Sequence, residues 1–85
     1  MKLDSRVKRL IAVGASVSAN CQPCLKTNAG KALKEGLDVQ EIAEAVEVGR
    51  MVRRGAAASM DAFAAGLDQA VPLGAAASSA GCECD

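Results

Sequence analysis

The chain has 85 residues, with ten basic and ten acidic side chains and no histidine, tyrosine or tryptophan. This length allows one small domain with a modest core, so self-association is expected to add further burial. A net charge of zero gives no electrostatic footprint for nucleic acid, and the lack of histidine excludes histidine-based acid–base catalysis and Cys₂His₂ zinc.

The first predicted element is a helix over residues 4–18. Its apolar positions recur with helical spacing at Leu3, Val7, Leu10, Gly14 and Val17. Basic residues precede this stretch, as they do in a signal peptide, but Asp4 and Ser5 interrupt the basic region. We therefore expect a cytoplasmic protein rather than a secreted one. No segment is long enough to span a membrane, so no membrane partner is expected.

The second predicted helix begins at Cys21 and ends near Glu35. Asn20 is the expected N-cap, and Pro23 falls in the first turn, where its missing N–H breaks no hydrogen bond. Gly36 suits the position that follows the last turn, where glycine is favoured. The predicted apolar face of this helix consists of Leu25, Ala29, Ala32 and Leu33.

Cys21 and Cys24 form a Cys-x-x-Cys pair at the start of this helix. The positive end of a helix stabilises a thiolate and lowers the pKa of a cysteine there from about 8.5 toward the range of about 3.5–7.5. The i, i+3 spacing brings both sulfur atoms to one face, where they can close a disulfide. Thiol redox chemistry is the first interpretation. Two small buried hydrophobic residues, or half of a four-cysteine zinc site, are the alternatives.

The third predicted helix begins at Asp38, and Glu41 three residues later completes a capping box. Its apolar positions keep a near-heptad spacing as far as Leu67, which favours one long helix or two nearly collinear ones. Gly49 and the small residues 55–58 allow another helix to approach closely. That neighbour is either a helix of the same subunit or a helix across an oligomer interface.

The helical pattern stops near residue 70, which divides the chain into a helical domain over 1–70 and a flexible tail over 71–85. The tail is rich in alanine, glycine and serine and ends in Cys82-Glu83-Cys84-Asp85. An exposed Cys-x-Cys pair oxidises readily and binds soft metals. We expect Cys82 and Cys84 either to bind a metal or metalloid, or to exchange disulfides with the first cysteine pair.

Five short stretches carry a family resemblance, at residues 10–13, 20–24, 32–37, 41–45 and 53–57. Together they resemble the alkylhydroperoxidase D-like, or carboxymuconolactone decarboxylase-like, family over about residues 5–65. The resemblance implies an all-α fold that assembles into trimers or hexamers and needs no metal or other cofactor. It also implies a hydroperoxide or disulfide substrate and a dithiol reductant. In such enzymes the second cysteine attacks the peroxide, which makes Cys24 the peroxidatic thiol and Cys21 the resolving one.

The chain departs from this family at positions that relay protons. Family members have a glutamate twelve residues before the first cysteine and a histidine four residues after the second, where this chain has Arg9 and Asn28. Pro23 stands where a further histidine often occurs. Acid–base catalysis contributes about 10²–10⁴ in rate, so weak peroxidase activity and no decarboxylation are expected. Arg9 is expected to stabilise a thiolate by its charge, and Asn28 to hydrogen-bond a thiol or its partner.

We therefore predict an all-α subunit with two shorter helices and one long or kinked helix. The predicted function is that of a thiol–disulfide redox protein with weak alkylhydroperoxidase or peroxiredoxin-type antioxidant activity. The alternative, from a different class, is a non-enzymatic oligomer whose cysteine pairs hold a metal, a metalloid or a partner protein. A third hypothesis is a scaffold that keeps its assembly without chemistry.

Overall fold

The structure, a computed structural model, describes the backbone of residues 1–70 and the side chains of residues 1–67. The predicted tail over 71–85, with the second thiol pair Cys82 and Cys84, lies outside the described residues. The all-α prediction is confirmed by the three helices of residues 1–70, α1 (Ser5–Ser18), α2 (Gln22–Lys34) and α3 (Val39–Ala70).

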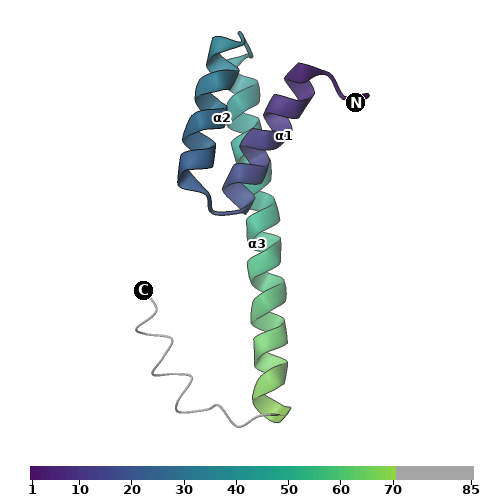
Figure 1. Cartoon of the computed structure of the whole chain (residues 1–85). Coiled ribbons are helices and arrows are strands. Elements are labelled where there is room, and N and C mark those ends of the chain that lie inside the picture. Colours follow the sequence, from purple (N-terminus) through teal and green to yellow (C-terminus); the bar gives the residue numbers. More distant parts are fainter. Residues whose placement is uncertain (71–85) are drawn as a thin grey trace.

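The first two helices form a hairpin that covers only the N-terminal half of α3 (Figure 1). In this arrangement α1 packs against both of the other helices, while α2 and α3 contact each other little. At 1.5 Å per residue, the 32 residues of α3 extend about 48 Å, so its C-terminal half projects beyond the hairpin. Of the two predicted forms, α3 is the single long helix. None of the described helices is both long and apolar enough to cross a membrane.

The core is small and lies where the three helices meet. Val13 and Ala32 are fully buried and Ile42 is nearly so, with larger side chains such as Leu10 packed around them. Leu33, predicted to lie on the apolar face of α2, is instead 57% exposed. The reason is that α2 rests almost entirely on α1, so only a narrow stripe of α2 is covered.

Two glycines allow α1 and α3 to cross at close range. A Cβ atom added to Gly49 would lie 2.4 Å from the carbonyl oxygen of Gly14 and 2.8 Å from the Cβ atom of Val17. A Cβ atom added to Gly55 would meet nothing within 4 Å. Gly49 therefore allows two helices of the same subunit to pack closely, which is one of the two predicted roles of the small residues.

The helix ends are set by short-range hydrogen bonds. Asp4 accepts a hydrogen bond from the backbone of Val7 at 2.8 Å and is the N-cap of α1, so this helix begins one residue later than predicted. Gly36 has a φ of 81° after the last turn of α2, as predicted. Asp38 accepts from the backbone N–H of Gln40 at 3.2 Å. Its predicted capping-box partner Glu41 is paired with Arg6 of α1.

Candidate functional site

The turn between α1 and α2 fixes the backbone of the first cysteine. Asn20 has a φ of 58°, in the left-handed region that asparagine tolerates better than most residues. Its N–H donates to Val17 at 3.1 Å, and the N–H of Cys21 donates to Ser16 at 3.0 Å, which together end α1. The prediction that Asn20 is the N-cap of α2 is therefore wrong. Cys21 is the N-cap, with extended backbone, and α2 begins at Gln22.

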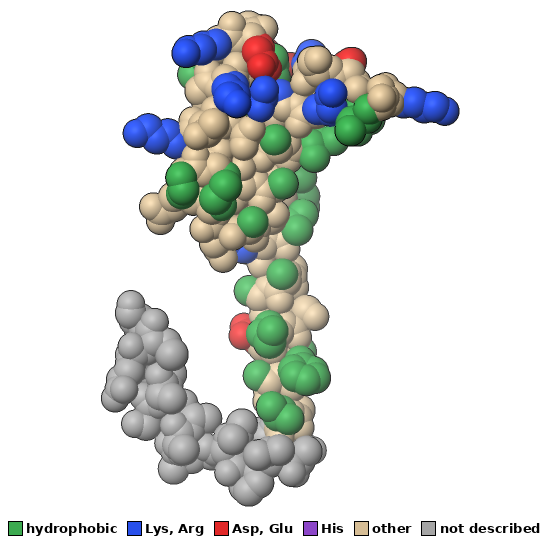
Figure 2. All heavy atoms as spheres, in the orientation of Figure 1, with side chains coloured by type: hydrophobic (Ala, Val, Ile, Leu, Met, Phe, Trp, Pro, Cys, Tyr) green, Lys and Arg blue, Asp and Glu red, His purple; other side chains and the backbone are tan. Residues whose placement is uncertain are grey.

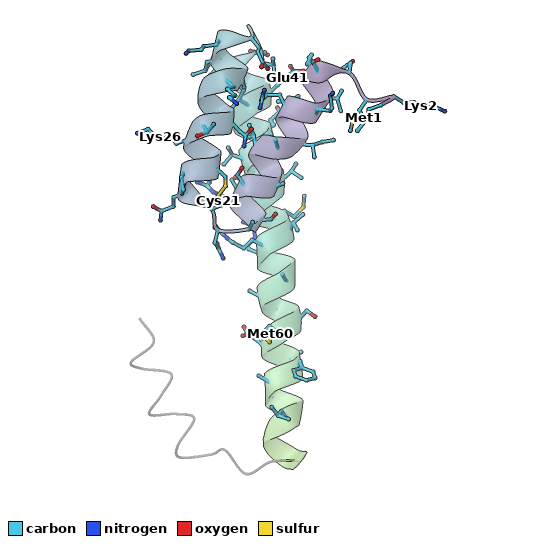
Figure 3. The ribbon with its side chains drawn as sticks, in the orientation of Figure 1. Met1, Lys2, Cys21, Lys26, Glu41 and Met60 are labelled. Atoms are coloured by element: carbon cyan, nitrogen blue, oxygen red, sulfur yellow. A yellow bond between two sulfur atoms is a disulfide. The ribbon has the colours of Figure 1, made fainter. Side chains whose placement is uncertain are left out.

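Cys21 and Cys24 are joined by a disulfide across the first turn of α2, with their Cα atoms 5.2 Å apart (Figure 3). Pro23 lies between them in that turn, as predicted. Cys21 is half-buried and Cys24 is exposed. No side chain caps α2 in this state. The first-turn amide of Cys24 is therefore available to a thiolate formed at Cys21 after reduction.

Arg9 on α1 and Asn28 on α2 are hydrogen-bonded to each other. Nη1 of Arg9 donates to Oδ1 of Asn28 at 2.8 Å, and Nδ2 of Asn28 donates to the backbone carbonyl of Cys24 at 2.9 Å. The other side of the guanidinium donates to both carboxylate oxygens of Glu35, at 3.1 and 2.9 Å. Arg9 is thus linked to the cysteine turn through Asn28, while Glu35 balances its charge.

The contact between Arg9 and Glu35 strengthens the charged form of each group. The hydrogen bond from Arg9 lowers the pKa of Glu35 below its ordinary value of 4.5, and the positive charges of Arg9 and Lys31 act in the same direction. The same hydrogen bond raises the pKa of Arg9. Both residues therefore stay ionised at neutral pH, and neither can relay a proton there.

Ser16 completes this network from inside the core. Its side chain is only 5% exposed, donates to the carbonyl of Ala12 at 2.7 Å and accepts from Asn28 at 3.3 Å. Neither Ser16 nor Glu35 was predicted from the sequence to belong to the site. The position of Ser16 between apolar residues of α1 could have indicated a buried polar side chain. Nothing local pointed to Glu35, because its partner Arg9 lies 26 residues away in the chain.

A surface hollow of about 230 Å³ lies beside the α1–α2 turn. It is lined by Cys21 of the disulfide and by two arginines of α3, Arg50 and Arg53. Nη1 of Arg53 donates to the side chain of Asn20 at 3.2 Å and to the carbonyl of Val17 at 3.4 Å. The i, i+3 spacing of the two arginines on a helix was the signal that could have revealed this pair.

Within the described part of the chain, no group of three or more histidine, cysteine, aspartate or glutamate side chains could hold a metal ion. The sulfur atoms of Cys21 and Cys24 are bonded to each other, and metal binding needs free thiolates. A four-cysteine zinc site, the alternative weighed for this pair, would also require Cys82 and Cys84, which lie outside the described residues.

Comparison with known proteins agrees with the resemblance that the sequence carries. The sequence pattern of the Carboxymuconolactone decarboxylase family matches residues 1–68. No curated protein and no solved structure matches the chain. The matched region includes α1, α2, almost all of α3 and both residues of the Cys21–Cys24 pair. The chain therefore belongs to the carboxymuconolactone decarboxylase family.

Proposed function

We propose that the protein is a thiol–disulfide oxidoreductase whose working groups are Cys21 and Cys24. The observation that carries this proposal is the disulfide across the first turn of α2, which leaves Cys24 exposed. A dithiol and a disulfide can interconvert there without moving a helix, because 5.2 Å between the Cα atoms lies within the usual range for a disulfide. The positive helix end favours the thiolates that such exchange requires.

The proposed oxidative half of the cycle uses an organic hydroperoxide. The thiolate of Cys24 attacks the terminal peroxide oxygen, the O–O bond breaks, and the alcohol leaves with a proton from solvent. Cys24 is thereby oxidised to a sulfenic acid. The thiolate of Cys21 then attacks the sulfur of Cys24, the disulfide forms, and hydroxide leaves as water. An external dithiol returns both cysteines to thiols and becomes a disulfide itself.

Asn28 and Arg9 act in this proposal as positioning residues. The amide of Asn28 holds the backbone carbonyl of Cys24 at 2.9 Å, and Arg9 fixes the orientation of that amide. Since the chain has no histidine, protons come from solvent. Peroxide reduction is therefore expected to be slow, whereas exchange with a disulfide substrate needs no such relay.

The proposal includes self-association into the trimer or hexamer implied by the family resemblance. The projecting half of α3 bears large apolar side chains that none of the described residues covers (Figure 2). Met60 is 63% exposed and Phe63 is 69% exposed. Burying them against other copies would add the apolar contact that this small core lacks. The proposed setting is the cytosol, where reducing systems maintain free thiols.

The proposed function is tested by redox equilibration of metal-free protein. A Cys82→Ser/Cys84→Ser chain isolates the first pair, which is equilibrated with reduced and oxidised dithiothreitol and then alkylated. We expect one reversible two-electron transition at Cys21 and Cys24. A pair that never reduces or never oxidises under these conditions contradicts the proposal. Stoichiometric metal that blocks alkylation of both thiols would contradict it too and support the metal-binding alternative.

A further inference from the structure

The hollow beside Cys21 has no role in the peroxide step, which takes place at Cys24. We propose that this hollow is the docking site for residues 82–85 of the same chain, and that Cys84 in this segment reduces the Cys21–Cys24 disulfide. The inference rests on the redox function proposed above and adds an internal electron donor to it. Two observations carry it: a hollow lined by two arginines and by Cys21 of the disulfide, and an acidic segment with two cysteines in the sequence.

The hollow carries positive charge that the described side chains balance only in part. Arg50 and Arg53 line it, and no acidic residue does. Arg53 is held by two uncharged acceptors, the side chain of Asn20 and a backbone carbonyl. These contacts fix the guanidinium beside the cysteine turn without neutralising it. A fixed guanidinium next to a partly buried site binds carboxylates well.

Arg50 and Arg54 share one carboxylate, that of Glu47. Glu47 lies 3.3 Å from Arg50 and 3.8 Å from Arg54, so one negative charge is shared between two positive ones. Counting Arg53 as well, this face of α3 keeps a surplus of positive charge. The N-terminus of α2, at the edge of the hollow, adds to that field. The hollow is therefore suited to an anionic occupant.

The segment Cys82-Glu83-Cys84-Asp85 has the matching chemistry. Glu83 and Asp85 flank Cys84 on both sides, so carboxylates bound by Arg50 and Arg53 would bring this thiol to the hollow. A volume of about 230 Å³ is smaller than that of most drug-sized sites and suits two or three side chains of a peptide.

The connecting chain is long enough for the segment to reach its own subunit. From Arg53 to the end of α3 at Ala70 the helix extends about 26 Å. From residue 70 to residue 82 the chain spans up to about 40 Å when extended. The segment can therefore return along α3 to the hollow of the same chain.

The electron transfer balances within one chain. The thiolate of Cys84 attacks the sulfur of Cys21, which lines the hollow, and the Cys21–Cys24 bond breaks with Cys24 leaving as a thiolate. The thiolate of Cys82 then attacks Cys84 and releases Cys21. Two electrons pass from the tail dithiol to the first pair, and the tail is left as a disulfide. The external dithiol of the proposed cycle then reduces the tail.

The test uses the full chain with only two cysteines, in the Cys24→Ser/Cys82→Ser background. Equilibration in glutathione buffers gives the effective concentration of Cys84 at Cys21. Arg50→Gln and, separately, Glu83→Gln/Asp85→Asn are expected to lower it by about two- to five-fold, and added salt by a similar factor. Arg54→Gln is the matched control, because Arg54 does not line the hollow. The tail substitutions leave the helical domain untouched, so their effect does not depend on its stability.

The two proposals can fail separately. An effective concentration that is unchanged by the tail substitutions, or a Cys21–Cys84 bond found only between chains, overturns the docking proposal. If the Cys82→Ser/Cys84→Ser chain still cycles with dithiothreitol, the redox function stands without it. Equal losses for Arg50→Gln and Arg54→Gln would also overturn the assignment of the hollow, since only general charge would then matter.

Discussion

Nη1 of Arg9 lies 2.8 Å from Oδ1 of Asn28, so two residues that the resemblance places at the family's proton-relay positions are direct hydrogen-bond partners. Their hydrogen bond links α1 to α2 beside the cysteine turn. Neither side chain can relay a proton as a glutamate or a histidine can. A guanidinium and an amide do not act as general acid or base near neutral pH. What remains is a network that holds the carbonyl of Cys24, with Glu35 balancing the charge of Arg9.

The role of Asn28 is tested by Asn28→Ala. This change removes hydrogen bonds to Arg9, Ser16 and the carbonyl of Cys24. We expect the free energy of unfolding to fall by about 1–2 kcal/mol, because the half-buried partners lose an acceptor or a donor. Exchange between the Cys21–Cys24 disulfide and dithiothreitol should also change in rate, because the cysteine turn is held less firmly. Urea denaturation and stopped-flow exchange measure the two effects. Thr27→Ala, at the exposed neighbouring position, is the control and should leave both unchanged.

The Arg9–Glu35 contact predicts a pH dependence of stability. The pKa of Glu35 is lower in the folded chain than its ordinary value of 4.5, so the folded state binds this proton less readily than the unfolded state. The contribution is therefore fully present above pH 4.5 and is lost as the pH falls through the folded pKa. Arg9 stays charged throughout.

Urea denaturation of the parent chain and of Glu35→Gln, repeated from about pH 3 to pH 8, measures this dependence. The difference in unfolding free energy should stay level from neutral pH down to about pH 5 and shrink in more acidic solution. A difference that instead grew on acidification would show that the pairing of Glu35 with Arg9 is not what lowers its pKa.

The close crossing of α1 and α3 predicts opposite effects for two glycine substitutions. In Gly49→Ala the new Cβ atom would lie 2.4 Å from the carbonyl oxygen of Gly14, so the two backbones must separate. We expect a loss of about 1–3 kcal/mol in unfolding free energy. Gly30→Ala is the matched control, because its Cβ atom meets nothing within 4 Å and alanine favours helix. It should raise stability by about 0.5–1 kcal/mol. Equal effects in thermal denaturation would contradict the crossing.

The exposed apolar face of α3 predicts an effect on assembly. Phe63→Asp puts a charge where a 69% exposed phenyl ring is proposed to contact another copy. Sedimentation velocity is expected to show a smaller species at the same protein concentration. Asp61→Lys changes charge on the opposite side of the helix and should leave the assembly intact. Loss of assembly in both variants, or in neither, would speak against this face as the interface.

Local patterns were enough to predict the features that depend on short stretches of chain. The Cys21–Cys24 spacing with Pro23 between them predicted a thiol pair at a helix start, and the structure joins them in a disulfide. Gly36 ends α2 as expected, because a left-handed residue after the last turn favours glycine. Asn20 was assigned to the wrong helix. Asparagine suits both an N-cap and a left-handed residue, and only the turn geometry separates the two.

The contacts across helices could not be found in this way. Glu35 meets Arg9 only because the chain turns at Asn20 and α2 packs back on α1. Arg53 meets Asn20 because α3 crosses α1 at Gly49, far away in sequence. These contacts depend on helix packing, which a single sequence does not specify. The family resemblance singled out Arg9 and Asn28 one by one, each toward the cysteine pair, and did not predict the hydrogen bond between them.

Rapid-quench mapping of thiols tests whether Cys21 and Cys24 reduce a hydroperoxide. Fully reduced, metal-free protein is mixed with one equivalent of an organic hydroperoxide, quenched at short times and digested for mass spectrometry. We predict that a Cys21–Cys24 disulfide forms faster than a free thiol of the same pKa is oxidised, and that Cys24→Ser abolishes its formation. Oxidation no faster than that of a free thiol, with no preference for this pair, would contradict a peroxide-reducing role for these cysteines.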